Sequence, residues 1–286
     1  MLKKYQSLAK SIFVLIIQPI LLYNIAMNKK GIFKAKRKDG SVYYRVSITR
    51  NSKHISLGSF DKIKDASKCY EEAAKIFDYP EIVIDSYDES FTIPYEKFII
   101  LINFRDNGIY ISNPVYLRPN FFYYYLDKDT ILKFDRDDLF YFSKHKIIKR
   151  GGHLFCNEYG NQINLLEKYS IGSYAVKDKD YRFINGDPYD FRYSNIEIIN
   201  RYHGVRKIVR NNKTFYEVKI HLKGYLKVGE FEDEITAAIA YNKAVDQLKK
   251  KYDKNFIQNF PDLSPKEYAL IYTEIKLPDS IMKYNI

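Results

Sequence analysis

Two segments of the chain, residues 31–77 and 204–248, share one order of apolar and polar positions. In the second segment, Tyr216, Val218 and Ile220 alternate with residues assigned to the opposite face. That period of two predicts a strand with one buried face. Turn-forming residues interrupt the pattern, and mostly small apolar residues then recur at helical spacing. Each segment therefore predicts three short strands followed by a helix.

The two segments align with each other as an internal repeat. Both have a Gly-Ile or Gly-Val start, an aromatic pair before two alternating apolar residues, a Gly-x-Phe step and an Ala-Tyr-Ala helix pattern. The offset between matched residues drifts only from 173 to 171, and the drift falls in the turns. A repeat of this kind indicates that one supersecondary unit occurs twice.

Positive charge is concentrated in these same segments. The chain has 286 residues and a net charge of +12, with 11 Lys/Arg and 2 Asp/Glu in residues 28–64 and 8 and 2 in residues 201–230. Concentrated positive charge on small modules indicates a polyanionic partner, most simply nucleic acid. The basic residues expected on the exposed sheet faces, and so expected to bind DNA, are Arg206, Lys207, Arg210, Lys213, Lys219, Lys34, Lys36, Arg37 and Arg45.

Motifs in the second segment strengthen this interpretation. They are Gly204-Val205-Arg206, the Gly229-x-Phe231 step, the Ala237-Ala238-x-x-Tyr241 helix and the closing Asn259-Phe260-Pro261. Together they resemble the Apetala2/ethylene-response-factor (AP2/ERF) DNA-binding domain. Residues 31–79 resemble it more weakly, since Phe33 replaces the family's arginine, and the family's strand tryptophans are absent from both copies. The resemblance implies a three-stranded sheet docked in the major groove of duplex DNA.

A second pattern lies between the repeats, within residues 132–202. It consists of Asn185, Gly186, Asp187, Arg192 and Asn195. This layout resembles HNH homing-type endonucleases, which often carry the same DNA-binding module downstream. The resemblance implies a ββα fold, a divalent cation that holds the scissile phosphate, and a histidine base that activates water.

The working residues of that family are missing from this chain. Arg182 and Phe183 stand where the family has a metal ligand and the base, and Phe191 replaces the usual asparagine. No histidine lies between His153 and His203. The remaining residues also fit a structural role, because Asn-Gly-Asp-Pro is a strong turn signal and Ser194 can cap a helix expected to follow. We therefore expect no catalytic residues and no cofactor.

Two alternative functions remain open from the sequence. An active HNH-type endonuclease would nick DNA with a divalent metal such as Mg²⁺, and its metal ligands would be Asn185, Asp187 and Asn195. A basic protein that binds RNA or a membrane surface would need the first 27 residues to be genuine and exposed. The leading hypothesis is DNA binding without catalysis, by a remnant of a mobile element or a transcription regulator descended from one.

The expected fold class is α+β, with an AP2/ERF-like module at each end and a degenerate ββα HNH-like region in the middle. The expected divisions are an apolar extension at 1–27, a divergent module at 28–80, an unassigned connection at 81–131, the HNH-like region at 132–202, the second module at 203–262 and a tail at 263–286.

Partners and location follow from the same observations. The expected partner is double-stranded DNA, with no small-molecule substrate. The apolar run at 11–27 is short for a membrane span and has no cleavage site after it, so a membrane partner is not expected. Cys69 and Cys156 form no disulfide framework or zinc-ligand spacing, which favours a reducing compartment. We expect the protein inside a cell, with DNA: in the cytoplasm of a prokaryote, in a nucleus or in a virus-infected cell.

Overall fold

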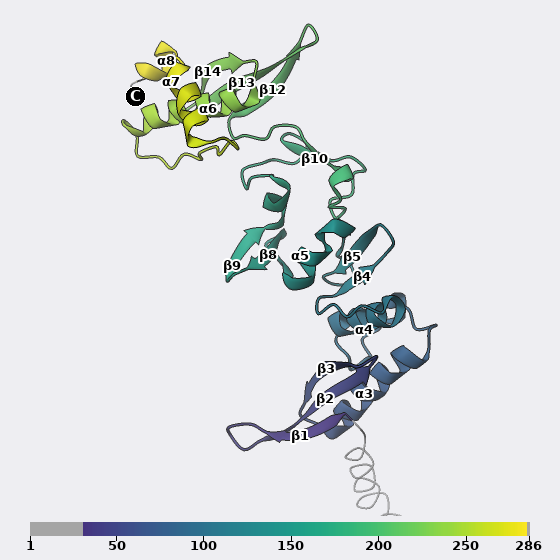
Figure 1. The fold of residues 1–286 in the computed structure, drawn as a ribbon. Coiled ribbons are helices and arrows are strands. Elements are labelled where there is room, and N and C mark those ends of the chain that lie inside the picture. The colour runs from purple at the N-terminus through teal and green to yellow at the C-terminus, as the bar shows by residue number, and fades with distance from the viewer. Residues whose placement is uncertain (1–30, 285–286) are drawn as a thin grey trace, which may run out of the picture. The chain divides into compact units, whose positions relative to one another are not determined.

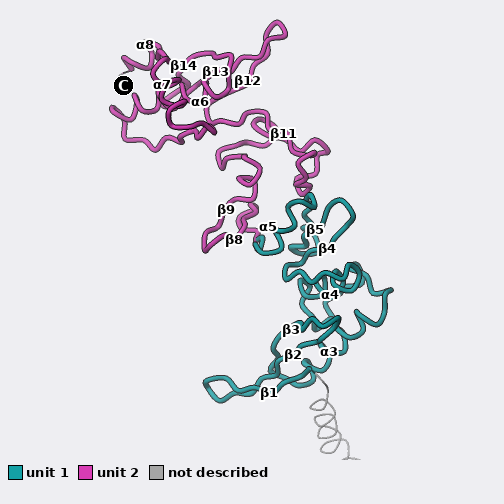
Figure 2. The backbone as a smooth tube through the Cα atoms, in the orientation of Figure 1, with its two compact units in different colours: residues 1–147 teal, residues 148–286 magenta. Residues whose placement is uncertain are grey.

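The computed structural model of the chain describes residues 31–284 and shows two compact units, residues 1–147 and 148–286 (Figure 2). The expectations for residues 1–27 lie outside the described residues. Small antiparallel sheets and helices make up both units, so the α+β class is confirmed (Figure 1). Within residues 31–284, no helix is both long and apolar enough to cross a membrane.

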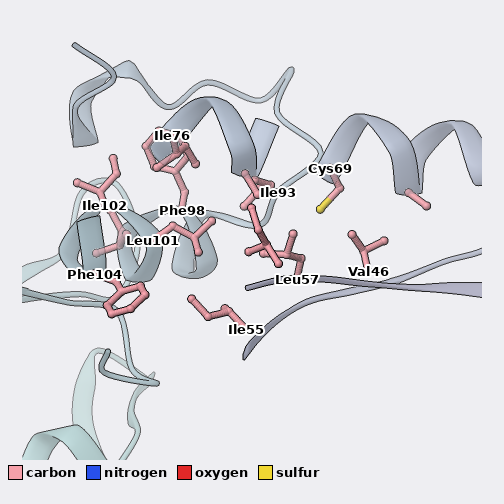
Figure 3. Close-up of a cluster of buried hydrophobic side chains, with 14 of the residues drawn as sticks. Val46, Ile55, Leu57, Cys69, Ile76, Ile93, Phe98, Leu101, Ile102 and Phe104 are labelled. Carbon is pink, nitrogen blue, oxygen red and sulfur yellow. The ribbon is translucent and has the colours of Figure 1, made fainter. Parts of the chain in front are cut away.

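The N-terminal unit begins with a three-stranded meander and a helix. Strands β1 (Ile32–Lys36), β2 (Val42–Arg50) and β3 (Lys53–Phe60) pair in chain order, and α3 (Ile63–Asp78) packs on one face. Apolar side chains of the sheet meet small side chains of α3, among them Cys69, in a fully buried core (Figure 3). Small helix residues let the helix lie close to the sheet, which increases the packing contacts.

The segment left unassigned by the sequence has a fold of its own. Helix α4 (Tyr95–Asn107) shares the core of the first sheet through Phe98, Leu101 and Ile102 (Figure 3). A second sheet follows, built from β4 (Val115–Leu117), β5 (Phe121–Tyr125) and β6 (Ile131–Asp135), and then the short helix α5 (Leu139–Lys144). Strand β6 crosses the division expected at 131/132, and both β6 and α5 belong to the N-terminal unit.

The middle region contains hairpins and short 3₁₀ turns. Strands β7 (Ile147–Arg150), β8 (His153–Glu158) and β9 (Asn161–Asn164) form one sheet, and β10 (Tyr181–Phe183) pairs with β11 (Ile196–Ile198) in another.

The prediction of a helix after Ser194 is wrong. A 3₁₀ turn at Tyr193–Asn195 leads directly into strand β11. Phe183 pairs with Ile196 and Tyr181 with Ile198, so the isoleucines alternate around Glu197 instead of forming a helix face. An apolar run this short does not distinguish strand from helix.

The C-terminal unit ends in a second three-stranded meander that is followed by a helix. Strands β12 (Val205–Arg210), β13 (Lys213–His221) and β14 (Tyr225–Phe231) form a meander, and α6 (Glu234–Lys249) covers one face. Helices α7 (Pro265–Glu274) and α8 (Asp279–Met282) pack against the same core. Each end of the described chain thus contains the predicted three strands and helix.

The two sheet–helix modules also share a local irregularity. The ladder between the second and third strands shifts register after Val46 in one module and after Val218 in the other, each opposite a glycine. The extra residue in the third strand, Leu57 or Val228, points into the core. Such β-bulges turn side chains toward or away from a face. The repeat therefore extends to the backbone path as well as the sequence.

Glycine opens both modules for a steric reason. The carbonyl of Gly204 accepts the Lys219 amide at 2.9 Å, and the carbonyl of Gly31 accepts the Ser47 amide at 2.8 Å. Both glycines have positive φ, and a Cβ added at either would lie 2.3 Å from its nearest neighbouring atom. In Gly204 that neighbour is the ring of Tyr241. Glycine is therefore required at the start of each module, where a Cβ would meet a backbone carbonyl of the second strand and the ring of the helix tyrosine, Tyr70 or Tyr241.

Candidate nucleic-acid interface and the Asn-Gly-Asp turn

Cross-strand pairing assigns each residue of the C-terminal sheet to a face. Val205 pairs with Val218, and both are buried against α6, so the residues that alternate with them lie on the outer face. The charged residues of this outer face are Arg206, Arg210, Lys213, Lys219, Lys227, Glu217 and Glu230. Five cations and two carboxylates give the face a net positive charge.

The two carboxylates are already paired with cations. Glu217 lies 2.8 Å from Lys219, and Glu230 lies 3.0 Å from Arg210 and 2.6 Å from Lys227. Among residues 31–284, Arg206 and Lys213 form no ion pair, and both are exposed. The positive charge left for a ligand is therefore centred on Arg206 and on Lys213 at the tip of the β12–β13 hairpin.

Three residues expected on the exposed faces lie on the helix side instead. Lys207 pairs with Tyr216, and Lys34 pairs with Tyr44, while both tyrosines pack toward the helix core. Lys36 follows Lys34 by two positions and shares its side. All three remain exposed because the first strand of each module is an edge strand that the helix covers least. A charged side chain can therefore occupy a helix-side position there without burial.

The N-terminal outer face differs from the C-terminal one. It carries Arg45 opposite Phe33, and Phe33 is 52% exposed. Tyr43 lies on the same face, with the Arg37 guanidinium 5.0 Å from its ring centre, and Arg37 also pairs with Asp61 at 2.6 Å. Of the four expected DNA-binding residues in this module, Arg37 and Arg45 lie at the outer face. The strongly basic face is the C-terminal one.

The metal candidates Asn185, Asp187 and Asn195 are engaged in the turn itself. Buried Asn195 accepts the amide of Asn185 through its side-chain oxygen at 2.8 Å and donates to the Asp190 carbonyl at 2.8 Å. Asn185 accepts the amide of Asp187 at 2.9 Å, and Asp187 accepts the amide of Tyr189 at 2.9 Å. These bonds close successive Asx turns and tie the loop to the start of β11.

Asp190, which the sequence analysis missed, is the centre of this loop. Its carboxylate is 2% exposed and receives two bonds from the Arg192 guanidinium, at 2.8 Å and 2.6 Å, and one from Asn185 at 3.0 Å. A buried carboxylate needs such charge-assisted partners to remain ionised. The Asp190-x-Arg192 spacing is the feature of the sequence that could have indicated this ion pair. The pair gives Arg192 a structural role within the loop.

The two residues that the HNH resemblance places at the ligand and base positions, Arg182 and Phe183, contact neighbouring residues of the fold. Arg182 pairs with Glu197 on the neighbouring strand at 2.5 Å. Phe183 is buried, with its ring 5.7 Å from that of Phe191. Within residues 31–284, no group of three or more His, Cys, Asp or Glu side chains could hold a metal ion.

Asparagines attach the second module to its surroundings. The side chain of Asn259 bonds both the amide and the carbonyl of His203, at 2.8 Å and 3.0 Å. Asn242 on α6 in turn bonds the carbonyl and amide of Asn259, at 2.7 Å and 2.8 Å. On the other side, Asn200 accepts the amide of Lys207 at the open edge of β12 at 2.8 Å. Asn259 therefore connects the two ends of the module through hydrogen bonds, an arrangement that we call the asparagine clasp.

His203 is held between aromatic rings beside this clasp. Its ring centre lies 4.9 Å from that of Tyr174 and 5.4 Å from that of Tyr241. Burial lowers the pKa of His203, against the opposing effect of the nearby Asp180 carboxylate. The neutral imidazole is favoured in the folded state.

A cleft of about 400 Å³ lies in the C-terminal unit against one part of the outer sheet face. Sheet residues at one wall include Arg206, Glu217 and Lys219, and residues from 174–180 and 200–204 line the other walls. The side chain of Glu217 is only 13% exposed, as expected for a sheet residue inside a cleft.

Comparison of the chain with protein-family models, with curated proteins and with solved structures finds no match.

Proposed function

We propose that the protein binds double-stranded DNA through the outer face of the β12–β14 sheet and does not cleave it. The observation that carries this proposal is the face itself, with five cations against two paired carboxylates and with Arg206 and Lys213 unpaired among the described residues. Positive side chains on one sheet face can neutralise phosphates and release counterions, which favours binding.

The shape of the module supports a groove-binding mode. Figure 1 shows the β12–β13 hairpin projecting from the module, and Asn211 and Asn212 at its tip both have positive φ, as in a tight two-residue turn. A narrow antiparallel ribbon fits the major groove, where Arg and Lys reach guanine edges and flanking phosphates. We infer sequence-specific or semi-specific binding of this kind, in keeping with the AP2/ERF resemblance and with a transcription regulator or mobile-element remnant.

The absence of catalysis is part of the proposal. Asn185, Asp187 and Asn195 each have a hydrogen-bonding role in the loop, and Phe183 is a core residue. These roles support a turn that positions β10 and β11. No observation in the described residues favours the nuclease alternative, which predicts metal-dependent nicking of supercoiled plasmid.

The proposal is tested by fluorescence anisotropy with a short blunt DNA duplex across a range of salt concentrations. Five cations and two carboxylates give the face a net charge of +3, which predicts a slope of roughly −3 in a plot of log affinity against log salt. Changing Arg210 and Lys213 together to Gln should weaken binding and reduce the slope by about two. The matched control changes Lys34 and Lys36 to Gln and removes the same charge from helix-side positions of the N-terminal module. Equal losses in both double variants would contradict the assigned face, and a flat salt response would contradict DNA binding.

A further inference from the structure

The cleft beside the basic face has the size of a small-ligand site. Its volume of about 400 Å³ lies in the range of pockets that hold small molecules. It lies within the C-terminal unit and contains none of the residues of the Asn-Gly-Asp turn. Segment 174–180 forms one wall of the cleft and the sheet face forms another. Both segments belong to the same compact unit.

The charge that remains available in this cleft is positive. Asp180 accepts the Val176 amide at 2.9 Å and the Asn200 side chain at 3.2 Å. The other lining carboxylate, Glu217, pairs with Lys219 at 2.8 Å. The remaining two cations of the lining, Lys179 and Arg206, have no acidic partner in the part of the chain that the structure describes. Two such cations facing one cleft favour an anionic ligand.

Aromatic rings line the same cleft as these cations. Tyr225 lines the cleft and is 74% exposed, with its ring centre 5.0 Å from that of His221. Tyr174, Tyr202 and His203 also line the cleft. A nucleobase gains binding energy by stacking on aromatic rings, and a neighbouring Lys or Arg can hold its phosphate. The lining thus combines the two kinds of contact that a nucleotide requires.

We propose that this cleft binds a single nucleotide, with the phosphate held by Lys179 and Arg206 and the base against Tyr225 and His221. The ligand can be free, or it can be an unpaired nucleotide of a DNA strand. Its placement beside a bound duplex rests on the proposed function, whereas binding of a free nucleotide does not.

The first test is calorimetric titration of the full-length protein with deoxyadenosine monophosphate. Saturable binding is expected, and Lys179→Gln should weaken it by at least about tenfold through loss of a charged contact. The matched control is Lys177→Gln on the same segment, because Lys177 is exposed and lines a different cavity. Tyr225→Ser should also weaken binding without lowering the melting temperature. No saturable binding, or equal binding by Lys179→Gln, would overturn the proposal.

Further ligands separate the contributions and the source of the nucleotide. Inorganic phosphate and deoxyadenosine should each bind more weakly than the monophosphate, and equal affinity of phosphate alone would rule out the base contact. A duplex with one unpaired adenine should bind more tightly than the paired duplex if the ligand is part of a strand, and Lys179→Gln should remove that gain. Monophosphate binding without the gain assigns the site to free nucleotides.

The two proposals fail in distinguishable ways. Monophosphate binding without affinity for the paired duplex would overturn the proposed function alone. Duplex binding without saturable monophosphate binding would overturn the nucleotide site alone.

Discussion

Asn195→Ala tests whether the Asn-Gly-Asp loop is a structural turn or a metal site. Asn195 is 4% exposed, and its side chain bonds the Asn185 amide and the Asp190 carbonyl, each at 2.8 Å. Alanine leaves one donor and one acceptor without these partners, and each such loss costs about 1–3 kcal/mol when the group is buried. Asn185 is itself exposed, so water can satisfy part of its amide. We expect a total destabilisation of about 2–4 kcal/mol.

The assay is thermal unfolding of the full-length chain with EDTA and with Mg²⁺. A loss of this size should lower the melting temperature of the C-terminal unit by on the order of 10 °C. The matched variant is Asp187→Ala, because Asp187 is exposed and accepts the Tyr189 amide, a bond worth about 1 kcal/mol or less. On the structural account the two variants differ in stability, and Mg²⁺ changes neither. The reasoning is refuted if Mg²⁺ stabilises the unmodified protein, both variants abolish that response equally, and Asn195→Ala unfolds at the unmodified temperature.

Three further outcomes follow from the C-terminal module. Gly204→Ala should lower the free energy of unfolding by about 2 kcal/mol or more, because φ is +73° and the new Cβ would lie 2.3 Å from the Tyr241 ring. In the same denaturant unfolding assay, Gly224→Ala should be nearly neutral, because no atom lies within 4 Å of its added Cβ. Asn242→Ala should destabilise by about 3 kcal/mol in the same assay, since it removes two bonds to the Asn259 backbone, and a loss below about 1 kcal/mol would contradict the clasp. Burial lowers the pKa of His203 from 6.5, so the contribution of the neutral imidazole to stability should be complete above about pH 6.5 and should decline as the pH falls through the lowered pKa. His203→Phe should flatten this pH dependence of the melting temperature.

The sheet–helix modules could be predicted from the sequence because several local signals agree. Alternation at Tyr216, Val218 and Ile220, turn residues between strands, and small residues at helical spacing all indicate the same order of elements. The structure has those elements at both ends of the described chain. The fold of residues 84–135 could not be predicted, because its short strands and α4 are apolar on most sides and show no clear period.

The assignment of faces required information that periodicity does not contain. The sequence shows that Lys207 and Arg206 are neighbours, but only pairing with Tyr216 and Glu217 places them on opposite sides. Lys227 was missed because its outer position depends on the register shift after Val218. A bulge changes which side chains share a face without changing composition.

The candidate loop shows a similar limit. The sequence groups Asn185, Asp187 and Asn195 as metal ligands of a nuclease, and in the structure their side chains form hydrogen bonds within one loop around Asp190. Most of their hydrogen-bond partners are backbone groups, which a side-chain motif does not record, and the one side-chain partner is the Asp190 carboxylate, which accepts from the Asn185 side-chain amide.

The most direct test of DNA binding by the outer face compares two neighbouring cations of one strand. Arg206→Gln and Lys207→Gln remove the same charge from adjacent exposed positions on opposite sides of β12. In anisotropy measurements with one duplex at one salt concentration, Arg206→Gln should weaken binding by about tenfold and Lys207→Gln should leave it within about twofold. Equal weakening by both variants, or a larger loss with Lys207→Gln, would contradict the account.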